Sequence, residues 1–144
     1  MAAAMNRIAV LRRAVFARHA NPWSAWSRWA TTPLIALPVW TRSRRHAAAV
    51  AVWFAVNPVL FPPPADTRAW STRAMLGEER WITERPRDGA LLVSMAASAA
   101  TVLGLVAARR RRPVATAAAL AVAMGLTMGY WQLMVRYRDR ALRR

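Results

Sequence analysis

The 144-residue chain contains no cysteine and no lysine, and its six acidic residues face 22 basic residues, all of them arginine. The absence of cysteine excludes disulfide bridges, Cys-ligated zinc or iron–sulfur centres and a thiol nucleophile. The formal net charge is +16, although 56% of the residues are hydrophobic. The arginines gather between long apolar runs. This distribution favours an integral membrane protein over a soluble basic domain, and the length predicts a single domain.

Two runs, residues 89–108 and 113–135, contain no charged residue. A helix needs roughly 20 such residues to cross the hydrocarbon core of a bilayer. Only the four arginines at 109–112 separate the two runs, which predicts an antiparallel helical hairpin. Core helices of a soluble protein are the alternative, but a chain this short has little other protein to surround them. The arginine block is then an anchor for anionic headgroups.

Small residues recur at a spacing of four in both runs, and the second contains a GxxxG pattern. Helices in a bilayer associate where small side chains let their backbones approach closely. The pattern predicts a helix-packing face, either within the hairpin or toward another protein, that includes Gly104, Gly125 and Gly129.

Two shorter apolar segments, 23–41 and 47–61, flank a link that contains three arginines. We expect two short spans, since tryptophans and arginines at their ends can reach the interfaces. A hairpin that lies flat on the membrane is the competing interpretation. Pro33 and Pro38 predict a kink in the first segment, because proline removes backbone hydrogen bonds.

Residues 66–85 are the one segment in which acids balance bases. They predict an amphipathic interfacial helix, capped by Asp66 or Thr67, with its tryptophans toward the lipid. Glu78 and Glu79 are adjacent and therefore point about 100° apart, so they do not form a shared carboxylate site. We expect these two carboxylates to form ion pairs within their own segment, with Arg73, Arg80 or Arg85.

Four motifs follow one another along the chain: NPWS at 21–24, NPxxFPPP at 57–64, WSxRxxLGE at 70–78 and a tryptophan at 81. Their order resembles an uncharacterised family of small multi-helix membrane proteins of prokaryotes. The resemblance covers roughly residues 20–140 and implies two paired hairpins in a membrane. It implies no activity, and the basic arm at 1–20 looks like an addition to the family's usual start.

In an antiparallel hairpin, positions 21 and 57 come close at the face where the central helix lies. We therefore expect an interfacial cluster of motif side chains: Asn21, Trp23, Asn57, Trp70, Arg73, Glu78 and Trp81. One interpretation is a polar lock that satisfies the broken backbone and docks the central helix. The other is a binding site for a lipid headgroup or a quinone-like ligand.

No sequence signature of a nucleotide-binding or hydrolytic site occurs, and no acidic residue lies inside an apolar run. His19 and His46 flank the first apolar segment on opposite sides, so we expect solvated or headgroup-facing histidines and no cofactor or metal site. The leading expectation is a non-catalytic scaffold or accessory subunit of a membrane complex. A membrane enzyme or carrier for a lipid-like substrate is the alternative.

The expected organisation is a basic arm over 1–20 and one membrane domain over 21–144. The two hairpin links hold seven arginines and the rest of the chain 15. The positive-inside tendency then predicts a multi-pass protein of the cell (inner) membrane with cytoplasmic termini. The expected partners are anionic lipid headgroups and a second copy or a larger membrane complex. Nucleic acid is not expected, because lipid headgroups suffice to explain the arginines.

Overall fold

The computed structural model describes residues 2–143, with the side chains of residues 10, 11 and 13–143, and this part of the chain is helical with no strand. The all-α prediction is confirmed. The elements in chain order are α1 (Ala2–His19), α2 (Pro22–Thr31), the 3-10 helix η1 (Thr32–Ile35), α3 (Ala36–Thr41), α4 (Arg44–Leu60), α5 (Trp70–Glu84), α6 (Gly89–Arg109) and α7 (Pro113–Leu142).

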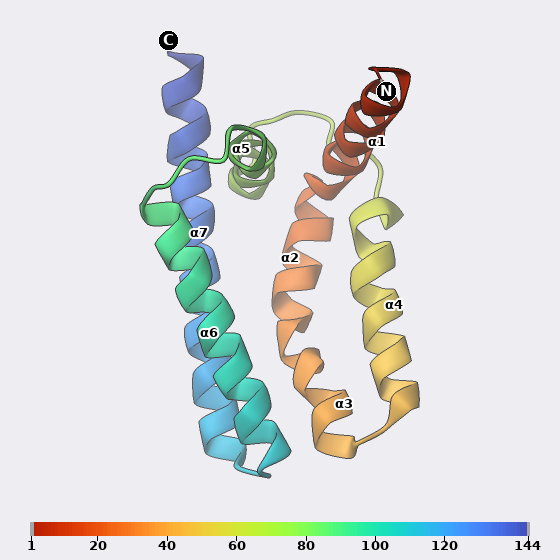
Figure 1. The fold of residues 1–144 in the computed structure, drawn as a ribbon, viewed down its shortest axis with the longest axis vertical. Coiled ribbons are helices and arrows are strands. Elements are labelled where there is room, and N and C mark those ends of the chain that lie inside the picture. Colours follow the sequence, from red (N-terminus) through yellow and green to blue (C-terminus); the bar gives the residue numbers. More distant parts are fainter. Residues whose placement is uncertain (1, 144) are drawn as a thin grey trace.

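Two helical hairpins stand side by side (Figure 1). One consists of α6 and α7, and the other of α2, η1 and α3 in line against α4. Both hairpin links lie at one end of the molecule, while both termini and α5 lie at the other end (Figure 1). α5 runs across the top of the space between the hairpins and contacts α7, α2 and α1.

The first leg of the first hairpin is interrupted as its prolines predict. Asn21 caps α2 by accepting a hydrogen bond from the Trp23 backbone N–H (2.9 Å), and Pro22 occupies the first helical turn. The α-helix gives way after Thr31 to the short 3-10 segment that contains Pro33, and α3 resumes at Ala36. This leg is therefore two short α-helices joined through η1.

The second leg, α4, begins where Ser43 accepts a hydrogen bond from the His46 backbone N–H (3.3 Å). It continues to Leu60 with Pro58 inside its last turn. With 17 residues it rises about 25 Å, which is less than the thickness of a hydrocarbon core. Only α6 and α7 among the described helices are long and apolar enough to cross a membrane.

The central helix starts later than the sequence suggests. Its N-cap is Ala69, and Asp66 instead accepts a hydrogen bond from the Arg68 backbone N–H (2.8 Å) in a turn that precedes the helix. The expected capping by Asp66 or Thr67 is therefore wrong. The start is set by Trp70, whose indole bonds to α7.

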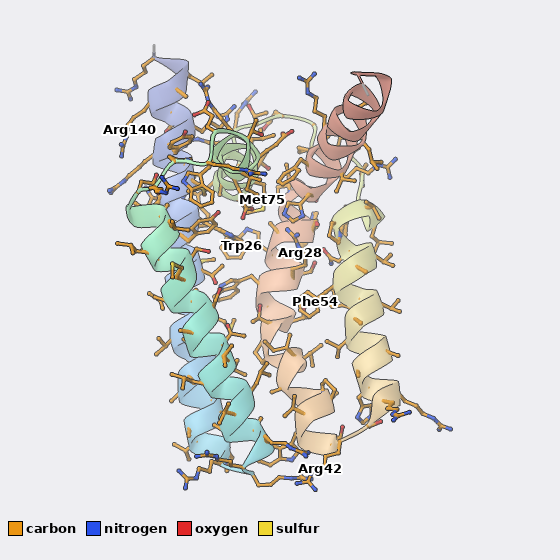
Figure 2. All side chains as sticks on the ribbon, viewed as in Figure 1. Trp26, Arg28, Arg42, Phe54, Met75 and Arg140 are labelled. Atoms are coloured by element: carbon orange, nitrogen blue, oxygen red, sulfur yellow. The ribbon has the colours of Figure 1, made fainter. Side chains whose placement is uncertain are left out.

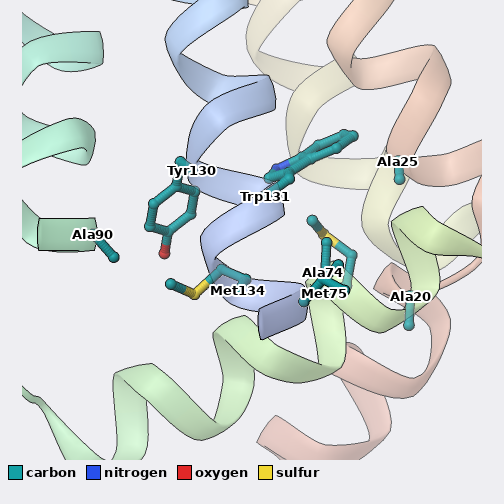
Figure 3. Packing of buried hydrophobic residues seen from close by; sticks show 9 residues of the cluster. Ala20, Ala25, Ala74, Met75, Ala90, Tyr130, Trp131 and Met134 are labelled. Atoms are coloured by element: carbon teal, nitrogen blue, oxygen red, sulfur yellow. The ribbon is translucent and has the colours of Figure 1, made fainter. Parts of the chain in front are cut away.

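The last helix is longer than its apolar run. α7 continues to Leu142, whereas the uncharged stretch ends at residue 135. The extension adds polar contacts with α5 through Tyr137 and Asp139, while Gln132 and Met134 of the apolar run also contact α5. Around that contact a buried cluster brings together Met75 of α5, Trp131 and Met134 of α7, and Ala25 of α2 (Figure 3).

Gly77 marks the closest approach of α5 to α7. A Cβ atom placed on Gly77 would lie 2.2 Å from the Met134 carbonyl oxygen, a distance that no side chain tolerates. The crossing therefore requires glycine at this position.

Candidate functional site

The two asparagines of the predicted cluster fasten the first hairpin. Asn57 is fully buried in α4, accepts a hydrogen bond from the Ser24 hydroxyl (2.9 Å) and donates one to the Ser27 hydroxyl (2.8 Å). Asn21 donates to the Pro62 carbonyl (2.9 Å) beyond the end of α4. These bonds connect the first part of α2 to the end of α4 and to the segment that follows it, and they provide buried polar groups with partners inside the protein.

Trp23 does not join these residues. Its side chain is 74% exposed, because the inward side of α2 at this level is occupied by Ser24 and Ala25, both fully buried. Trp26, one turn later, takes the inward direction. It stacks on Trp70 (6.0 Å between ring centroids) and meets Trp131 edge to face (5.8 Å).

The α5 residues of the predicted cluster contact α7 and its neighbours. Trp70 donates from its indole N–H to Gln132 (2.8 Å), Trp81 donates to Asp88 (3.2 Å), and Arg73 forms an ion pair with Asp139. The expectation that these indoles point into lipid is therefore wrong. α5 turns its tryptophan side toward the protein, where Trp70 packs against Trp131 of α7 and Trp81 bonds to Asp88 at the start of α6.

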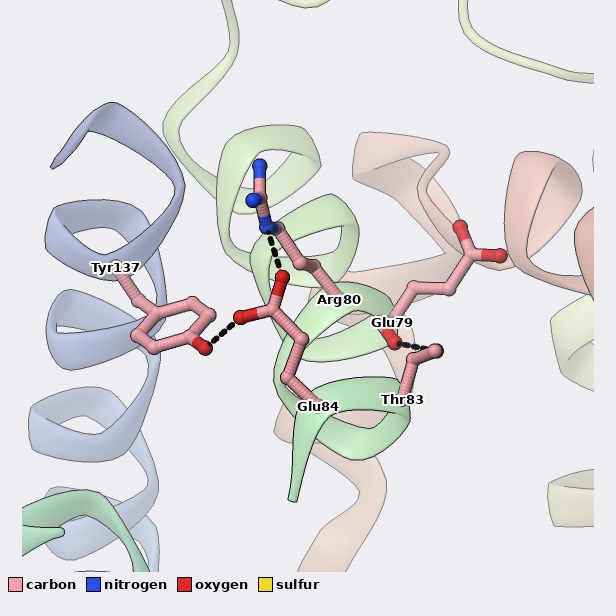
Figure 4. A network of polar contacts seen from close by, with 5 residues as sticks. All are labelled: Glu79, Arg80, Thr83, Glu84 and Tyr137. Carbon is pink, nitrogen blue, oxygen red and sulfur yellow. Dashed lines mark hydrogen bonds and ion pairs between the residues drawn. The ribbon is translucent and has the colours of Figure 1, made fainter. Parts of the chain in front are cut away.

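Glu78 differs from the other acidic residues of α5. Two of the three arginines expected as its partners pair with other carboxylates: Arg73 with Asp139 and Arg80 with Glu84. The Arg80–Glu84 pair belongs to an exposed network that the Tyr137 hydroxyl extends (Figure 4). Glu78 instead lies on the inner side of α5, where its Oε1 accepts a hydrogen bond from the Tyr130 hydroxyl (3.1 Å). The prediction of an ion pair between Glu78 and an arginine of its own segment is therefore wrong.

A cavity of about 250 Å³ opens next to Glu78, between the two hairpins and beneath α5. Side chains from α1, α2, η1, α4, α5 and α7 line it, among them His19, Arg28, Phe54, Met75, Glu78 and Trp131. Trp26 and Met75 lie in the same space between α7 and α2 (Figure 2). A second cavity of about 260 Å³ shares Glu78, Thr127 and Trp131 with the first and continues toward the serines and threonine of α6.

Arg28 provides the positive charge of the first cavity. Its Nε–H donates to the Ser24 carbonyl (3.1 Å), one Nη donates to His19, and the other reaches the Met75 sulfur (3.7 Å). The described residues hold no ion pair within 4 Å between Arg28 and Glu78, although their charges attract each other. The cavity therefore separates two opposite charges.

Burial alters the proton affinity of the groups near this cavity. Desolvation, followed by the charge of Arg28, lowers the pKa of His19 to about 4, so the imidazole is neutral at pH 7. Desolvation raises the pKa of Glu78, while the hydrogen bond from Tyr130 and the charge of Arg28 oppose the rise. The expectation of a solvated or headgroup-facing His19 is wrong, because the Arg28 side chain of α2 and the Phe16 ring lie against the imidazole.

The comparisons with known proteins add a family. A model described as "Family of unknown function (DUF6653)" matches residues 1–126. The chain belongs to this family. No curated protein and no solved structure matches it.

The extent of the DUF6653 match differs from the expected extent of the family resemblance at both ends. The match begins at residue 1, so the basic arm belongs to the family region and is not an addition. It stops at residue 126, before the part of α7 that receives α5. Tyr130, Trp131 and Met134, which contact the motif helix, all lie beyond it.

Sequence reasoning about this DUF6653 member missed His19, Arg28 and Tyr130 as neighbours of Glu78. Arg28 carried a usable signal, because a charge next to an apolar segment is a functional hypothesis by default. Its carboxylate partner lies 50 residues away, and no local pattern connects the two. Tyr130 follows the GxxxG motif directly and resembles an ordinary interface aromatic.

The predicted packing glycines face in different directions. Gly104 is buried, and a Cβ placed on it would lie 2.9 Å from the Leu120 side chain of α7. Gly125 and Gly129 have nothing within 4 Å of such a Cβ and face outward. The inner face of α7 is formed instead by other buried residues: Thr116, Leu120, Ala123 and Tyr130.

Proposed function

We propose that this DUF6653 member is a multi-pass integral membrane protein that acts without catalysis, as a scaffold or accessory subunit. The observation that carries the proposal is the exposed apolar surface of α6 and α7. The most apolar 18-residue stretch of α6 has a mean hydropathy of 2.1, yet only 11% of it is buried inside the protein. For α7 the mean hydropathy is 1.5 and the buried share is 22%. In water, a surface of this kind is unfavourable, whereas lipid tails cover it without penalty.

The dimensions support insertion of the second hairpin. The 21 residues of α6 rise about 31 Å, close to the roughly 30 Å of a hydrocarbon core. Arginines occupy the link at 109–112, where they can reach headgroups.

The first hairpin carries polar side chains in its interior, and they bond to one another. The Trp53 indole donates to the Thr31 hydroxyl (2.8 Å), and Asn57 joins Ser24 and Ser27. Internal partners of this kind are what the bilayer requires of polar groups at depth. The arginines at the start of α4 can reach the headgroups, and the shorter α4 is compatible with a crossing of a locally thinned bilayer.

The accessory role is supported by two features. The first is that most side chains of the predicted cluster use their polar atoms in intramolecular bonds that stabilise the fold. These side chains are Asn21, Asn57, Trp70, Arg73 and Trp81. In addition, the outward GxxxG stripe of α7 offers a surface that another transmembrane helix can approach closely.

Two experiments test this proposal. Membranes from cells that express the chain are washed at alkaline pH, and we expect the chain to stay in the pellet. The chain is then extracted in mild detergent, and we expect it to elute with a second copy or another membrane protein. A monomeric chain in native detergent extracts contradicts the accessory role, and release into the alkaline wash contradicts membrane insertion.

A variant pair makes the second experiment specific. Gly125→Leu combined with Gly129→Leu places bulk on the outward stripe of α7 and should abolish co-elution without unfolding the chain, since both positions face open space. Ala99→Leu adds similar bulk on the exposed surface of α6 and should leave co-elution intact. Equal loss in both variants contradicts association through the stripe.

Ligand binding between the hairpins is a second candidate function. It is favoured by the cavity that holds Arg28 and Glu78 apart.

A further inference from the structure

The cavity beneath α5 holds two opposite charges that do not neutralise each other directly. Arg28 comes from α2 and Glu78 from α5, both line the cavity, and no ion pair within 4 Å joins them. Charges withdrawn from water are unfavourable unless a partner neutralises them. The space between the two residues is therefore suited to a group that supplies both missing counter-charges.

Both residues retain bonding capacity toward this space. The guanidinium of Arg28 carries five N–H groups, and the structure gives protein partners to three: the Ser24 carbonyl, His19 and the Met75 sulfur. Oε1 of Glu78 accepts from Tyr130, and Oε2 has no protein donor among the described residues. Donors thus remain at one side of the cavity and an acceptor at the other.

The other walls match an amphiphile at a membrane surface. Trp29, Phe54 and Trp131 supply aromatic surface, and Thr32 and Thr127 supply hydroxyls. At about 250 Å³ the cavity is near the lower limit of small-molecule sites, which fits a polar headgroup and not a whole lipid. α5 covers it from the side of the termini, so acyl chains would leave along the hairpins.

We propose that this cavity binds a zwitterionic headgroup that combines a phosphate with a primary ammonium, as in an aminophospholipid. Arg28 donates to the phosphate, and Glu78 accepts from the ammonium. Guanidinium groups match phosphate oxygens through paired N–H donors, and charge-assisted hydrogen bonds are the stronger kind. Trp29 and Trp131 add faces on which the ammonium can rest.

Other lipids fit this arrangement less well. A headgroup with a phosphate and no cation leaves Glu78 facing a like charge. A quinone carries no charge and leaves both Arg28 and Glu78 without counter-ions. A quaternary ammonium supplies the charge but has no N–H to donate to Oε2.

The inference rests on the proposed insertion in a membrane, and its test uses the full chain after that insertion has been checked by alkaline washing. The delipidated chain in mild detergent is titrated with short-chain phosphatidylethanolamine, phosphatidylcholine and phosphatidylglycerol, and bound lipid is counted by native mass spectrometry. We expect phosphatidylethanolamine to bind about tenfold more tightly than the other two, the typical effect of one charged hydrogen bond.

Single substitutions test which residues cause the preference for phosphatidylethanolamine. Glu78→Gln should remove the preference for phosphatidylethanolamine over phosphatidylglycerol, and its amide oxygen can still accept from Tyr130. Glu79→Gln makes the same charge change at the next position of α5, about 100° around the helix, and should leave the preference unchanged. Arg28→Gln should weaken all three lipids, since the phosphate is common to them.

A variant that fills the cavity tests whether a loss of lipid binding reflects the site and not misfolding. Thr127→Leu adds bulk to a residue that lines both cavities, changes no charge, and should reduce binding of all three lipids while helix content by circular dichroism stays constant. If it leaves binding unchanged, the lipids bind elsewhere and the proposal is overturned.

The outcomes separate this inference from the proposed function. Equal binding of the three lipids, or equal effects of Glu78→Gln and Glu79→Gln, overturns the headgroup site even if the chain resists alkaline washing. Displacement of phosphatidylethanolamine by a short-chain quinone, at an affinity that Glu78→Gln does not alter, also overturns it. Free phosphoethanolamine that binds as tightly as the lipid supports the same chemistry with a soluble ligand.

Discussion

Gly77 is the residue on which the contact between α5 and α7 depends most directly. An alanine Cβ there would lie 2.2 Å from the Met134 carbonyl oxygen, so the helices must separate. We expect Gly77→Ala to lower the free energy of unfolding by about 3 kcal/mol, the upper part of the range for overpacked cores. The matched control is Gly129→Ala, which meets open space and should be neutral or stabilising by up to about 1 kcal/mol. Thermal unfolding in detergent measures both, and equal midpoints for Gly77→Ala and the unaltered chain would show that this crossing is not close packed.

His19 makes stability depend on pH. Its pKa is about 4 in the folded chain and about 6.5 otherwise, so between these values the unfolded chain binds a proton that the folded chain excludes. The contribution of His19 to the free energy of unfolding is therefore fully present above pH 6.5. It is lost as the pH falls to 4, and the total loss is about 3 kcal/mol. Arg28 and the Phe16 ring are the groups against the imidazole. His19→Gln should reduce the fall in melting temperature between pH 7 and pH 4.5, and an unchanged fall contradicts the buried neutral histidine.

Glu78 gives stability a pH dependence opposite to that of His19. Burial raises its pKa, so its contribution is present below the ordinary carboxyl pKa and is lost as the pH rises through the folded value. Arg28 and Tyr130 face it and limit the rise. We expect Glu78→Gln to unfold at a higher temperature than the unaltered chain at pH 8 and at a similar temperature at pH 4. A lower midpoint at pH 8 would mean that the charged carboxylate is stabilised in the fold.

At the scale of elements, three helix ends are formed by arginines in the left-handed region. Arg85 follows α5 with φ 50°, and Arg111 lies in the link before α7 with φ 56°. Glycine adopts this conformation without strain, so Arg85→Gly should stabilise the fold by about 1 kcal/mol. Arg111→Gly should gain less, because the Arg111 guanidinium lies over the Trp40 ring at 5.3 Å and joins the two links. Melting temperatures that rise equally in both variants would show that the contact with Trp40 contributes nothing.

The elements could be predicted from the sequence wherever a local signal defines them. Uncharged runs gave α6 and the first part of α7, and Pro33 gave the break in the first leg. The end of α7 was missed because apolarity stops at residue 135 while helical hydrogen bonding continues. The inward direction of Glu78 was missed for a related reason. It depends on α7 reaching α5, a contact between residues more than 50 positions apart.

At the scale of the whole molecule, the two hairpins meet at both ends and leave the cavity between these contacts. Near the termini, Trp26, Trp70 and Trp131 pack together, and near the links Ala36, Ala108 and Leu120 form a second buried cluster. Each hairpin has its own internal bonds, and between the two clusters the Trp29 indole of α2 donates a hydrogen bond to the Met124 carbonyl of α7 (3.2 Å). The pair of hairpins can therefore hold a ligand between them without rearranging either one.

The absence of cysteine makes the arrangement of the hairpins in a membrane directly testable. Single cysteines at Arg45 and Arg110 report on the two links, and single cysteines at Ala65 and Leu142 report on the opposite end of the molecule. If both hairpins cross the bilayer, a membrane-impermeant maleimide added to intact cells should label the first pair and should reach the second pair only after permeabilisation. Labelling of Arg110→Cys without Arg45→Cys would mean that the second hairpin crosses while the first lies flat. That arrangement would separate the two hairpins and remove the cavity at Glu78, because residues of both hairpins line it. The same four variants, labelled before and after the Gly77→Ala change, would show whether the contact of α5 with α7 holds the two hairpins in register.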